Sequence, residues 1–238
     1  MFKLIKNSWT LPVAIFLLGA LSIIAYGIKH HTPQGIGRTV HFRQTWTANG
    51  GKVTFQAEWT KYTRADGFWK AVQTYYNDDG TVKKVDIQFG SPQKGAAFQV
   101  DEQNRLLVVT GPIYHASHSL DIAKARLDPS FVREDTLLGY PVVVFRISQD
   151  SDSYIELYRS LELDDYLKNI KANSAGYTTI EADRIILGEP TAEQLTVPDY
   201  PVSFDLYKAM IRQAERQGDQ ERAAAMRQTL SQLEQNLR

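Results

Sequence analysis

The 238-residue sequence contains no cysteine and no excess of either charge, with 27 basic and 27 acidic side chains. Without cysteine the chain has no disulfide bond, no thiolate nucleophile, no cysteine-ligated zinc site and no thioether-linked lipid anchor. The balanced charge argues against nucleic acid as a partner, because a phosphate backbone demands a basic surface. Any attachment to a membrane must therefore be made by the peptide itself.

The sequence also lacks the common catalytic motifs. It has no Gly-x-Ser-x-Gly elbow, no Walker lysine and no His-Glu-x-x-His, so we predict neither an enzyme nor a cofactor. The histidine pair at ligand spacing is His115 and His118, with Asp121 three residues on. Pro112 and the small residues around the pair indicate a surface loop, so we predict no metal site. A metal-dependent hydrolase at His115 and His118 is the third of our functional hypotheses.

One long uncharged run interrupts an otherwise globular composition. Residues 9–28, WTLPVAIFLLGALSIIAYGI, rise about 1.5 Å each as a helix and so match the roughly 30 Å hydrocarbon layer of a membrane. A cleaved signal peptide is the alternative, since Lys3 and Lys6 form a basic start and Ala25 and Gly27 are small. Cleaved apolar cores usually run about 7–15 residues, so we predict an uncleaved, single-pass inner-membrane anchor. The main domain then lies on the extracytoplasmic, periplasmic side.

The rest of the chain begins with strand-like alternation. TVHFRQTW and KVTFQAEWTKY alternate apolar and polar residues, and Asn49-Gly50 between them is typical of a two-residue hairpin turn. Such a turn pairs Trp46 with Val53, Phe42 with Ala57 and Val40 with Trp59. Carrying the register through GFWKAVQTYY and TVKKVDIQF gives four strands with one apolar and one polar face. On the predicted polar face, Trp69, Ala71 and Tyr75 are exceptions.

Further strands are predicted for AAFQV, RLLVVTG, PVVVFRI, SYIELYRSL and YTTIEADRIIL. Short helices are expected at residues 119–126 and 164–172. A sheet of about nine strands with one apolar face should curl around its own core. The predicted fold class is therefore mainly β, a strongly curved antiparallel meander (a half-barrel) after one transmembrane helix and before a C-terminal helical hairpin.

The C-terminal segment changes to a helical period. One apolar stripe runs from Tyr207 to Ala214 and a second from Ala223 to Leu237, with Gly218-Asp219 between them, which indicates a helical hairpin. The hairpin either docks on the β-domain or offers a helix to a partner. We therefore divide the chain into a cytoplasmic tail (1–8), the anchor (9–28), a linker (29–38), the β-domain (39–201) and the hairpin (202–238).

The ending TTIEADRIILGEPTAEQLTVPDYP, residues 178–201, resembles the periplasmic lipoprotein carriers and their relatives, the LolA/LolB/RseB-like fold. The matching positions are Leu195, Val197, Pro198 and Tyr200. The resemblance implies a strongly curved antiparallel sheet around an apolar cavity closed by helices. Because this chain has a predicted anchor and no cysteine to carry a lipid, the resemblance implies holding, sensing or assembly at the inner membrane rather than shuttling.

Two further hypotheses follow. The first is a non-enzymatic binding protein attached to the lipid bilayer, holding an apolar ligand (a lipid, an acyl chain or a lipoprotein segment) against its curved sheet. The second is a scaffold subunit that binds a protein partner through its C-terminal helices. The predicted ligand-binding residues are the large apolar side chains of the first four strands, which are equally typical of a plain hydrophobic core: Phe42, Trp46, Phe55, Trp59, Phe68, Val72, Ile87 and Phe89.

Overall fold

The structure, a computed structural model, describes residues 36–113, 122–148 and 152–237. Its strands are β1 Arg38–Ala48, β2 Val53–Thr63, β3 Trp69–Tyr76, β4 Val82–Ser91, β5 Ala96–Asp101, β6 Leu106–Pro112, β7 Phe131–Leu137, β8 Tyr140–Ser148, β9 Tyr154–Ser160, β10 Asp165–Asn173, β11 Gly176–Leu187 and β12 Val202–Ser203. Its helices are α2 Ile122–Arg126, α3 Ala192–Leu195, α4 Asp205–Arg216 and α5 Gln220–Asn236.

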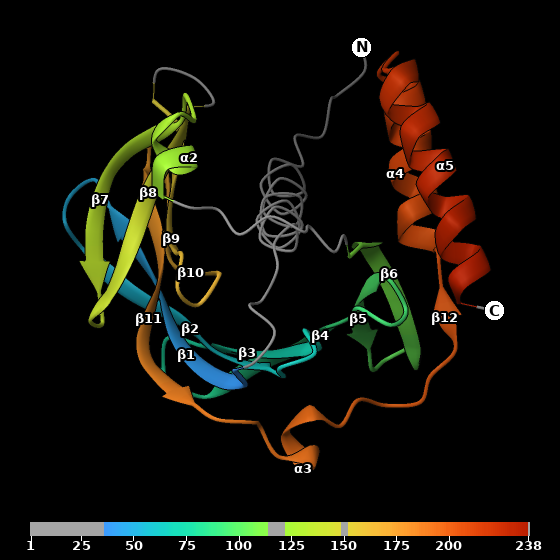
Figure 1. The fold of residues 1–238 in the computed structure, drawn as a ribbon, viewed down its shortest axis with the longest axis horizontal. Coiled ribbons are helices and arrows are strands. Elements are labelled where there is room, and N and C mark those ends of the chain that lie inside the picture. The colour runs from blue at the N-terminus through green and yellow to red at the C-terminus, as the bar shows by residue number, and fades with distance from the viewer. Residues whose placement is uncertain (1–35, 114–121, 149–151, 238) are drawn as a thin grey trace, which may run out of the picture.

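The strands form one sheet of twelve in the order β12-β6-β5-β4-β3-β2-β1-β11-β10-β9-β8-β7. All neighbours are antiparallel except the short β12, which is parallel to β6. The sheet bends into an arch whose edge strands, β7 and β12, do not meet (Figure 1). The prediction of a mainly β, strongly curved and open sheet is confirmed.

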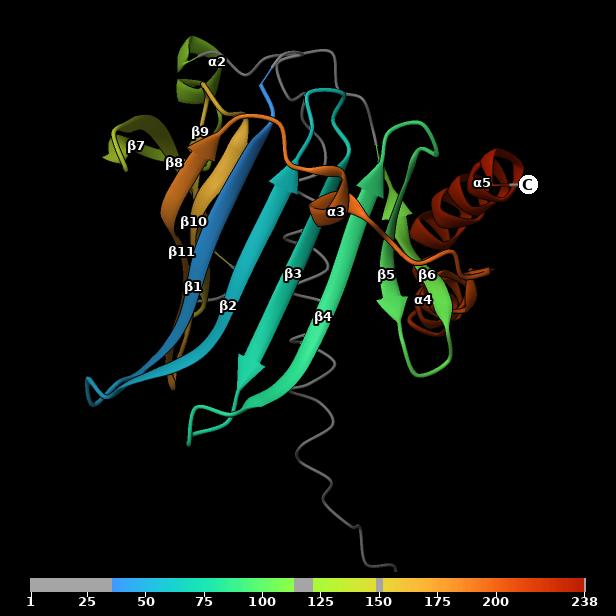
Figure 2. The same cartoon turned by 90° about the horizontal axis from the view of Figure 1, so that it is seen from below.

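The two sides of this arch differ in what covers them. The segment from α3 to β12 runs along the outside (Figures 1 and 2), and its Val197 and Tyr200 pack against the core of Phe89 and Phe98. We call that side the outer face. The side chains that alternate with Phe89 along β4 and its neighbours form the inner face, which is turned to the inside of the arch.

The predicted register in the meander is wrong. The structure pairs Phe42 with Trp59 and Trp46 with Thr54, because the first turn has three residues and not two. Gly51 N donates to Ala48 O, Ala48 N donates to Lys52 O, and Gly51 takes a positive φ of 77°. This is a type I turn followed by a left-handed glycine, a geometry that adds one residue to a two-residue turn. A bulge between Gln44 and Thr45 shifts the register once more.

The same type of turn recurs between β2 and β3, where it has the largest consequence. Arg64 N donates to Phe68 O, Gly67 N donates to Arg64 O, and Gly67 takes a φ of 86°. Because the loop is one residue longer than predicted, Trp59 pairs with Gln73, and Val72 lies on the face opposite Trp59 and not on the same face. A one-residue change reverses the faces of every later strand relative to β2. The single apolar face predicted for the four strands therefore does not exist.

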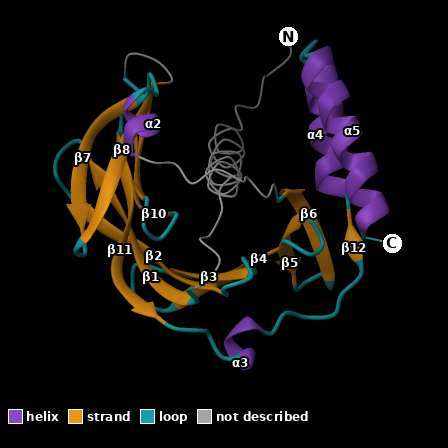
Figure 3. Ribbon diagram, viewed as in Figure 1, coloured by secondary structure: helices purple, strands orange, loops and turns teal. Residues whose placement is uncertain are grey.

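The helix predictions had mixed outcomes. Residues 122–126 form α2, while residues 119–121 lie outside the described part. Strand β10, residues 165–173, takes the place of the helix predicted for residues 164–172, so that helix prediction is wrong. The C-terminal hairpin is confirmed: Tyr207, Ile211 and Ala214 of α4 pack against Ala223 of α5. Figure 3 shows both helices beside the β6–β12 end of the sheet.

The hairpin docks on the sheet through α4, which lies beside β6, and through the end of α5. Leu233 is 2% exposed and belongs, with the half-buried Leu237, to the outer-face core around Phe98. In the described part of the chain, no helix is both long and apolar enough to span a bilayer. The predicted anchor at residues 9–28 lies outside that part.

Candidate functional site

The inner face collects the aromatic side chains that point into the arch. The strand register places the residues of this face, aromatic and polar, on successive cross-strand rows. One row holds Phe42, Trp59, Gln73 and Asp86, and the next holds Gln44, Ala57, Tyr75 and Lys84. Arg38, Thr63, Trp69 and Gly90 form a third row, with Val40, Lys61, Ala71 and Gln88 between. Trp46 continues the same side of β1. Three of the four tryptophans of the chain thus lie on one face.

The eight residues predicted to bind a ligand are divided between the two faces. Phe42, Trp46 and Trp59 lie on the inner face. Val72, Ile87 and Phe89 lie on the outer face, and Phe68 from the turn stacks on Phe89 with ring centres 6.1 Å apart. Phe55 is on the outer side as well, 41% exposed, where its ring contacts Tyr76.

Sequence reasoning missed Trp69 and Tyr75 as inner-face aromatics. Trp69 lies over Gly90 so closely that a Cβ at that glycine would overlap the indole ring, which explains why a residue without a side chain stands there. Burial, and after it the Asp86 carboxylate, raises the pKa of Tyr75 to about 12. The missed signal was present in the sequence, because both residues were the exceptions on the predicted polar face.

Polar side chains between these rings are mostly tied to one another. Gln73 Nε2 donates to Gln44 Oε1 at 3.1 Å, and Gln44 Nε2 donates to Gln56 Oε1 at 3.0 Å. Lys84 Nζ lies 2.8 Å from Asp86 Oδ2 and 5.9 Å from the centre of the Tyr75 ring. The inner face is therefore amphipathic: aromatic surface alternates with fixed amides and cations.

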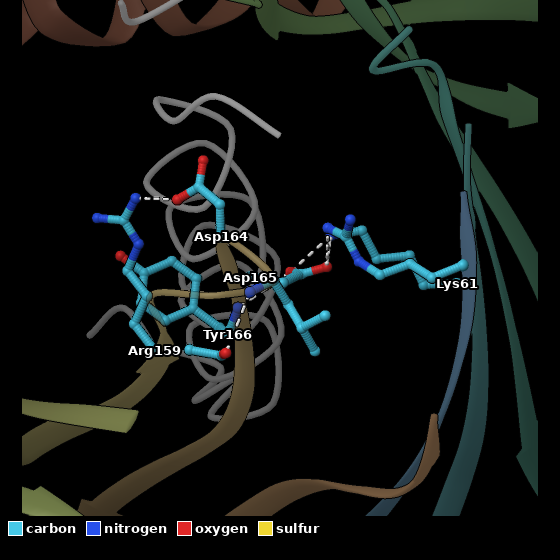
Figure 4. A network of polar contacts seen from close by, with 8 residues as sticks. Lys61, Arg159, Asp164, Asp165 and Tyr166 are labelled. Carbon is cyan, nitrogen blue, oxygen red and sulfur yellow. Dashed lines mark hydrogen bonds and ion pairs between the residues drawn. The ribbon is translucent and has the colours of Figure 1, made fainter. Parts of the chain in front are cut away.

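A buried group of charges joins the middle of the sheet to the β9–β10 turn. Asp165 Oδ1 lies 2.7 Å from Lys61 Nζ, and its Oδ2 accepts from Arg38 Nη2 at 3.1 Å. Next to it, Asp164 pairs with Arg159. Figure 4 shows Asp165 turned toward Lys61 and Asp164 turned toward Arg159. Except for Lys61, which is 25% exposed, each of these side chains is more than nine-tenths buried.

The two adjacent carboxyls differ in their electrostatics. Burial disfavours ionisation of Asp165, but Lys61 and Arg38 outweigh it and hold the pKa of Asp165 below its ordinary value. Burial dominates at Asp164 and raises its pKa, in spite of Arg159. Asp165 is thus the anion around which the two strands and the turn are assembled.

Among the described residues, no group of three or more histidine, aspartate or glutamate side chains is placed to hold a metal ion. His115, His118 and Asp121 lie outside those residues, so the structure does not describe the predicted loop.

Comparison with known proteins gives structural matches only. No family model matches the chain, and no curated protein sequence matches it. The structure of the Pseudomonas aeruginosa MucA/MucB complex matches 76% of this chain and 61% of that chain, with 17% identity and a TM-score of 0.42. The chain thus spans less than two thirds of that protein. An uncharacterised conserved protein of Thermus thermophilus matches with 9% identity over 78% of this chain and 99% of that chain, with a TM-score of 0.42.

A LolA superfamily protein of Nitrosomonas europaea is also among the matches, with 10% identity over 75% of this chain and 97% of that chain and a TM-score of 0.28. Likeness at this level carries no conclusion about what this chain binds, so the site has to be interpreted from its own residues.

Proposed function

We propose that the chain is a non-enzymatic binding protein that holds an amphipathic ligand, a lipid or the acylated segment of a lipoprotein, against the inner face of its arch. The observation that carries this proposal is the collection of Trp46, Trp59, Trp69 and Tyr75 on that face. Burial of apolar surface is worth about 25 cal/mol per Å², and aromatic rings supply the most area per side chain.

The two faces differ in how far the chain itself covers their apolar side chains, and this difference supports the proposal for the inner face. Its large apolar side chains, such as Phe89 and Phe98, are covered by the chain's own C-terminal segment and by Leu233. The inner-face rings Trp59 and Trp69 are only half-buried. Trp59 packs in part against the core of Val40, Phe42 and Val144, whereas Trp69 packs against none of the core clusters of the described residues. Apolar surface that the protein does not cover with its own core is open to a ligand, and on this face Trp69 offers most of it.

The scaffold hypothesis loses support from the position of the hairpin. In that hypothesis the apolar stripe of α5, from Ala223 to Leu237, binds a partner. In the structure, however, Leu233 and Leu237 pack on the outer-face core, and Met226 and Leu230 pack between α4 and α5. The protein partner that we still propose is a lipoprotein, whose acylated segment would bind the inner face.

The decisive experiment is ligand binding by the full chain held in an amphipathic polymer. We expect a neutral fluorescent alkyl reporter to bind, and Trp69→Ala to weaken that binding roughly tenfold, since truncation of a ring that contacts ligand costs about 1–2 kcal/mol. The measurement is a fluorescence titration of each variant, after thermal melting has confirmed that it is folded.

The matched control is Phe55→Ala, an aromatic truncation on the outer face. It should leave the affinity for the reporter unchanged, because Phe55 faces Arg43 and Tyr76. Equal losses in both variants would show that the inner face is not the binding surface, and no binding by the wild-type chain would end the proposal.

We further propose that residues 9–28 anchor this domain in the inner membrane and leave it on the extracytoplasmic side. The support is the uncharged length of that run. Alkaline phosphatase fused after Arg238 should be active in cells, because the enzyme needs the oxidising compartment. A mature protein that begins near residue 28, found by N-terminal sequencing, would replace the anchor with a cleaved signal peptide.

A further inference from the structure

In the described part of the chain, the buried side-chain atoms without a hydrogen-bond partner are four that can donate and one carboxylate oxygen, Asp164 Oδ2; one of the donors, Asn169 Nδ2, lies on β10. The other three donors lie on β1 and β2. They are the Arg38 Nε–H, the Thr63 hydroxyl and the Trp59 indole N–H. Arg38 and Thr63 are both 2% exposed and lie opposite each other on β1 and β2. Buried donors are nearly always paired in proteins, so a group of unpaired ones needs an explanation.

These three donors share one region of the inner face. Arg38 and Thr63 form one cross-strand pair, Val40 and Lys61 the next on that face, and Phe42 and Trp59 the one after. Lys61 is thus placed between the unpaired donors. Its ammonium is 25% exposed and lies 6.0 Å from the centre of the Trp69 ring, so it is the cation of this group that solvent reaches.

The same region carries an excess of positive charge. Arg38, Lys61 and Arg159 supply three cations, whereas Asp164 and Asp165 supply two carboxylates. An oxyanion offers acceptors only, in addition to a negative charge, and charge-assisted hydrogen bonds are the stronger kind. Three unpaired donors against one unpaired acceptor, Asp164 Oδ2, beside an unbalanced cation, fit that chemistry better than they fit a neutral hydroxyl or a second cation.

We propose that the Arg38–Lys61–Thr63 end of the inner face binds the oxyanion head group, carboxylate or phosphate, of an amphipathic ligand whose chain lies on Trp59, Trp69 and Tyr75. This inference rests on the proposed function and adds the charge of the ligand to it. Lys61 makes the first contact from solvent, and the buried donors on the adjacent rows complete the coordination of the head group.

The first test compares probes of one chain length on the full chain in an amphipathic polymer: dodecanoate, dodecyl phosphate and dodecanol, each displacing the neutral alkyl reporter. We expect the two anions to bind roughly tenfold to a hundredfold more tightly than dodecanol, as a charge-assisted hydrogen bond implies. The tighter of the two anions identifies the head group as carboxylate or phosphate.

The second test removes the cation. Lys61→Met should abolish the preference for the anions and leave the affinity for dodecanol within about twofold, because the methionine still covers the ring below it. Lys84→Met is the matched control, since Lys84 lies on the same face, over Tyr75, and is also paired with an aspartate. It should keep the full anion preference.

A third variant separates ligand binding from a plain folding role. Thr63→Val removes one unpaired buried hydroxyl, so it should not lower the melting temperature, yet it should weaken dodecanoate or dodecyl phosphate binding severalfold. The inference is overturned if the anions and dodecanol bind equally to the wild type, or if Lys61→Met and Lys84→Met behave alike. Binding by none of the three probes would overturn the proposed function as well, whereas dodecanol binding without anion preference would overturn this inference alone.

Discussion

Asp165→Ala is expected to lower the free energy of unfolding by roughly 3–5 kcal/mol, as measured by denaturant titration, because it leaves buried cations without their anion. Asp165 is 7% exposed and is bound by both Arg38 and Lys61, from two strands more than a hundred residues away in the sequence. The Arg38 side chain is buried as well, so removal of the anion leaves its charge without a partner away from water.

The pH dependence gives a second readout for the same residue. Because the folded pKa of Asp165 is lowered, its ionised form contributes stability that is present above the ordinary value of about 4 and is lost as the pH falls through the folded pKa. The wild-type chain should therefore lose stability below pH ~4 more steeply than Asp165→Ala. The raised pKa of Asp164 acts in the opposite direction, since its contribution is lost as the pH rises.

The control is Asp135→Ala, which removes a carboxylate that is 46% exposed and 3.7 Å from Arg133. Surface pairs of this kind contribute about 0–1 kcal/mol. If both alanine variants are destabilised to the same small extent, the charges around Asp165 do not hold the β9–β10 turn to the sheet.

Leu233→Asp should cost roughly 4 kcal/mol and release the C-terminal hairpin from the sheet. The substitution puts a carboxylate where a 2% exposed side chain packs with Phe98 and Val109, in a cluster made of apolar residues. Limited trypsin digestion should cut α5 faster, because its exposed arginines become cleavable once the released helices can unfold locally, and the unfolding midpoint should fall.

Gln232→Asp introduces the same charge one residue earlier, on the exposed side of α5. It should stay within about 0.5 kcal/mol of the wild type. Equal protease sensitivity of Leu233→Asp and Gln232→Asp would show that docking of the hairpin does not depend on the contact of Leu233 with the outer-face core. The apolar stripe of α5 would then again be a candidate surface for the partner of the scaffold hypothesis.

Much of the fold could be predicted from local patterns. The strands of the meander, β5, β6, β8, β9 and β11 follow from alternation, and the hairpin follows from its two apolar stripes. Three strands were missed for identifiable reasons. β7 carries the charged run Arg133–Glu134–Asp135, β10 has a bulge at Leu167 that breaks its alternation, and β12 has only two residues.

The candidate site could be predicted only in part, because its faces depend on turn length. Asp66-Gly67 predicts a turn, but it does not say whether Gly67 is the second or the third loop residue. Side-chain contacts with the backbone decide this: Asp66 Oδ1 accepts from Phe68 N at 3.0 Å. Most of the residues predicted to bind a ligand consequently lie on the outer face, opposite Trp59 and Trp69. The pairing of Asp165 with Lys61 and Arg38 joins segments that are far apart in the sequence, so no local sequence pattern predicts it.

The two free edges of the arch bear on its behaviour in solution. A twelve-stranded sheet with open ends presents unpaired backbone groups that invite other copies to add strands. Here one end is the exposed, charge-rich β7, and the other is the two-residue β12, followed at once by α4. Both are poor templates for another strand. The sheet formed by the described residues can therefore keep two open edges without inviting further copies to add strands to it.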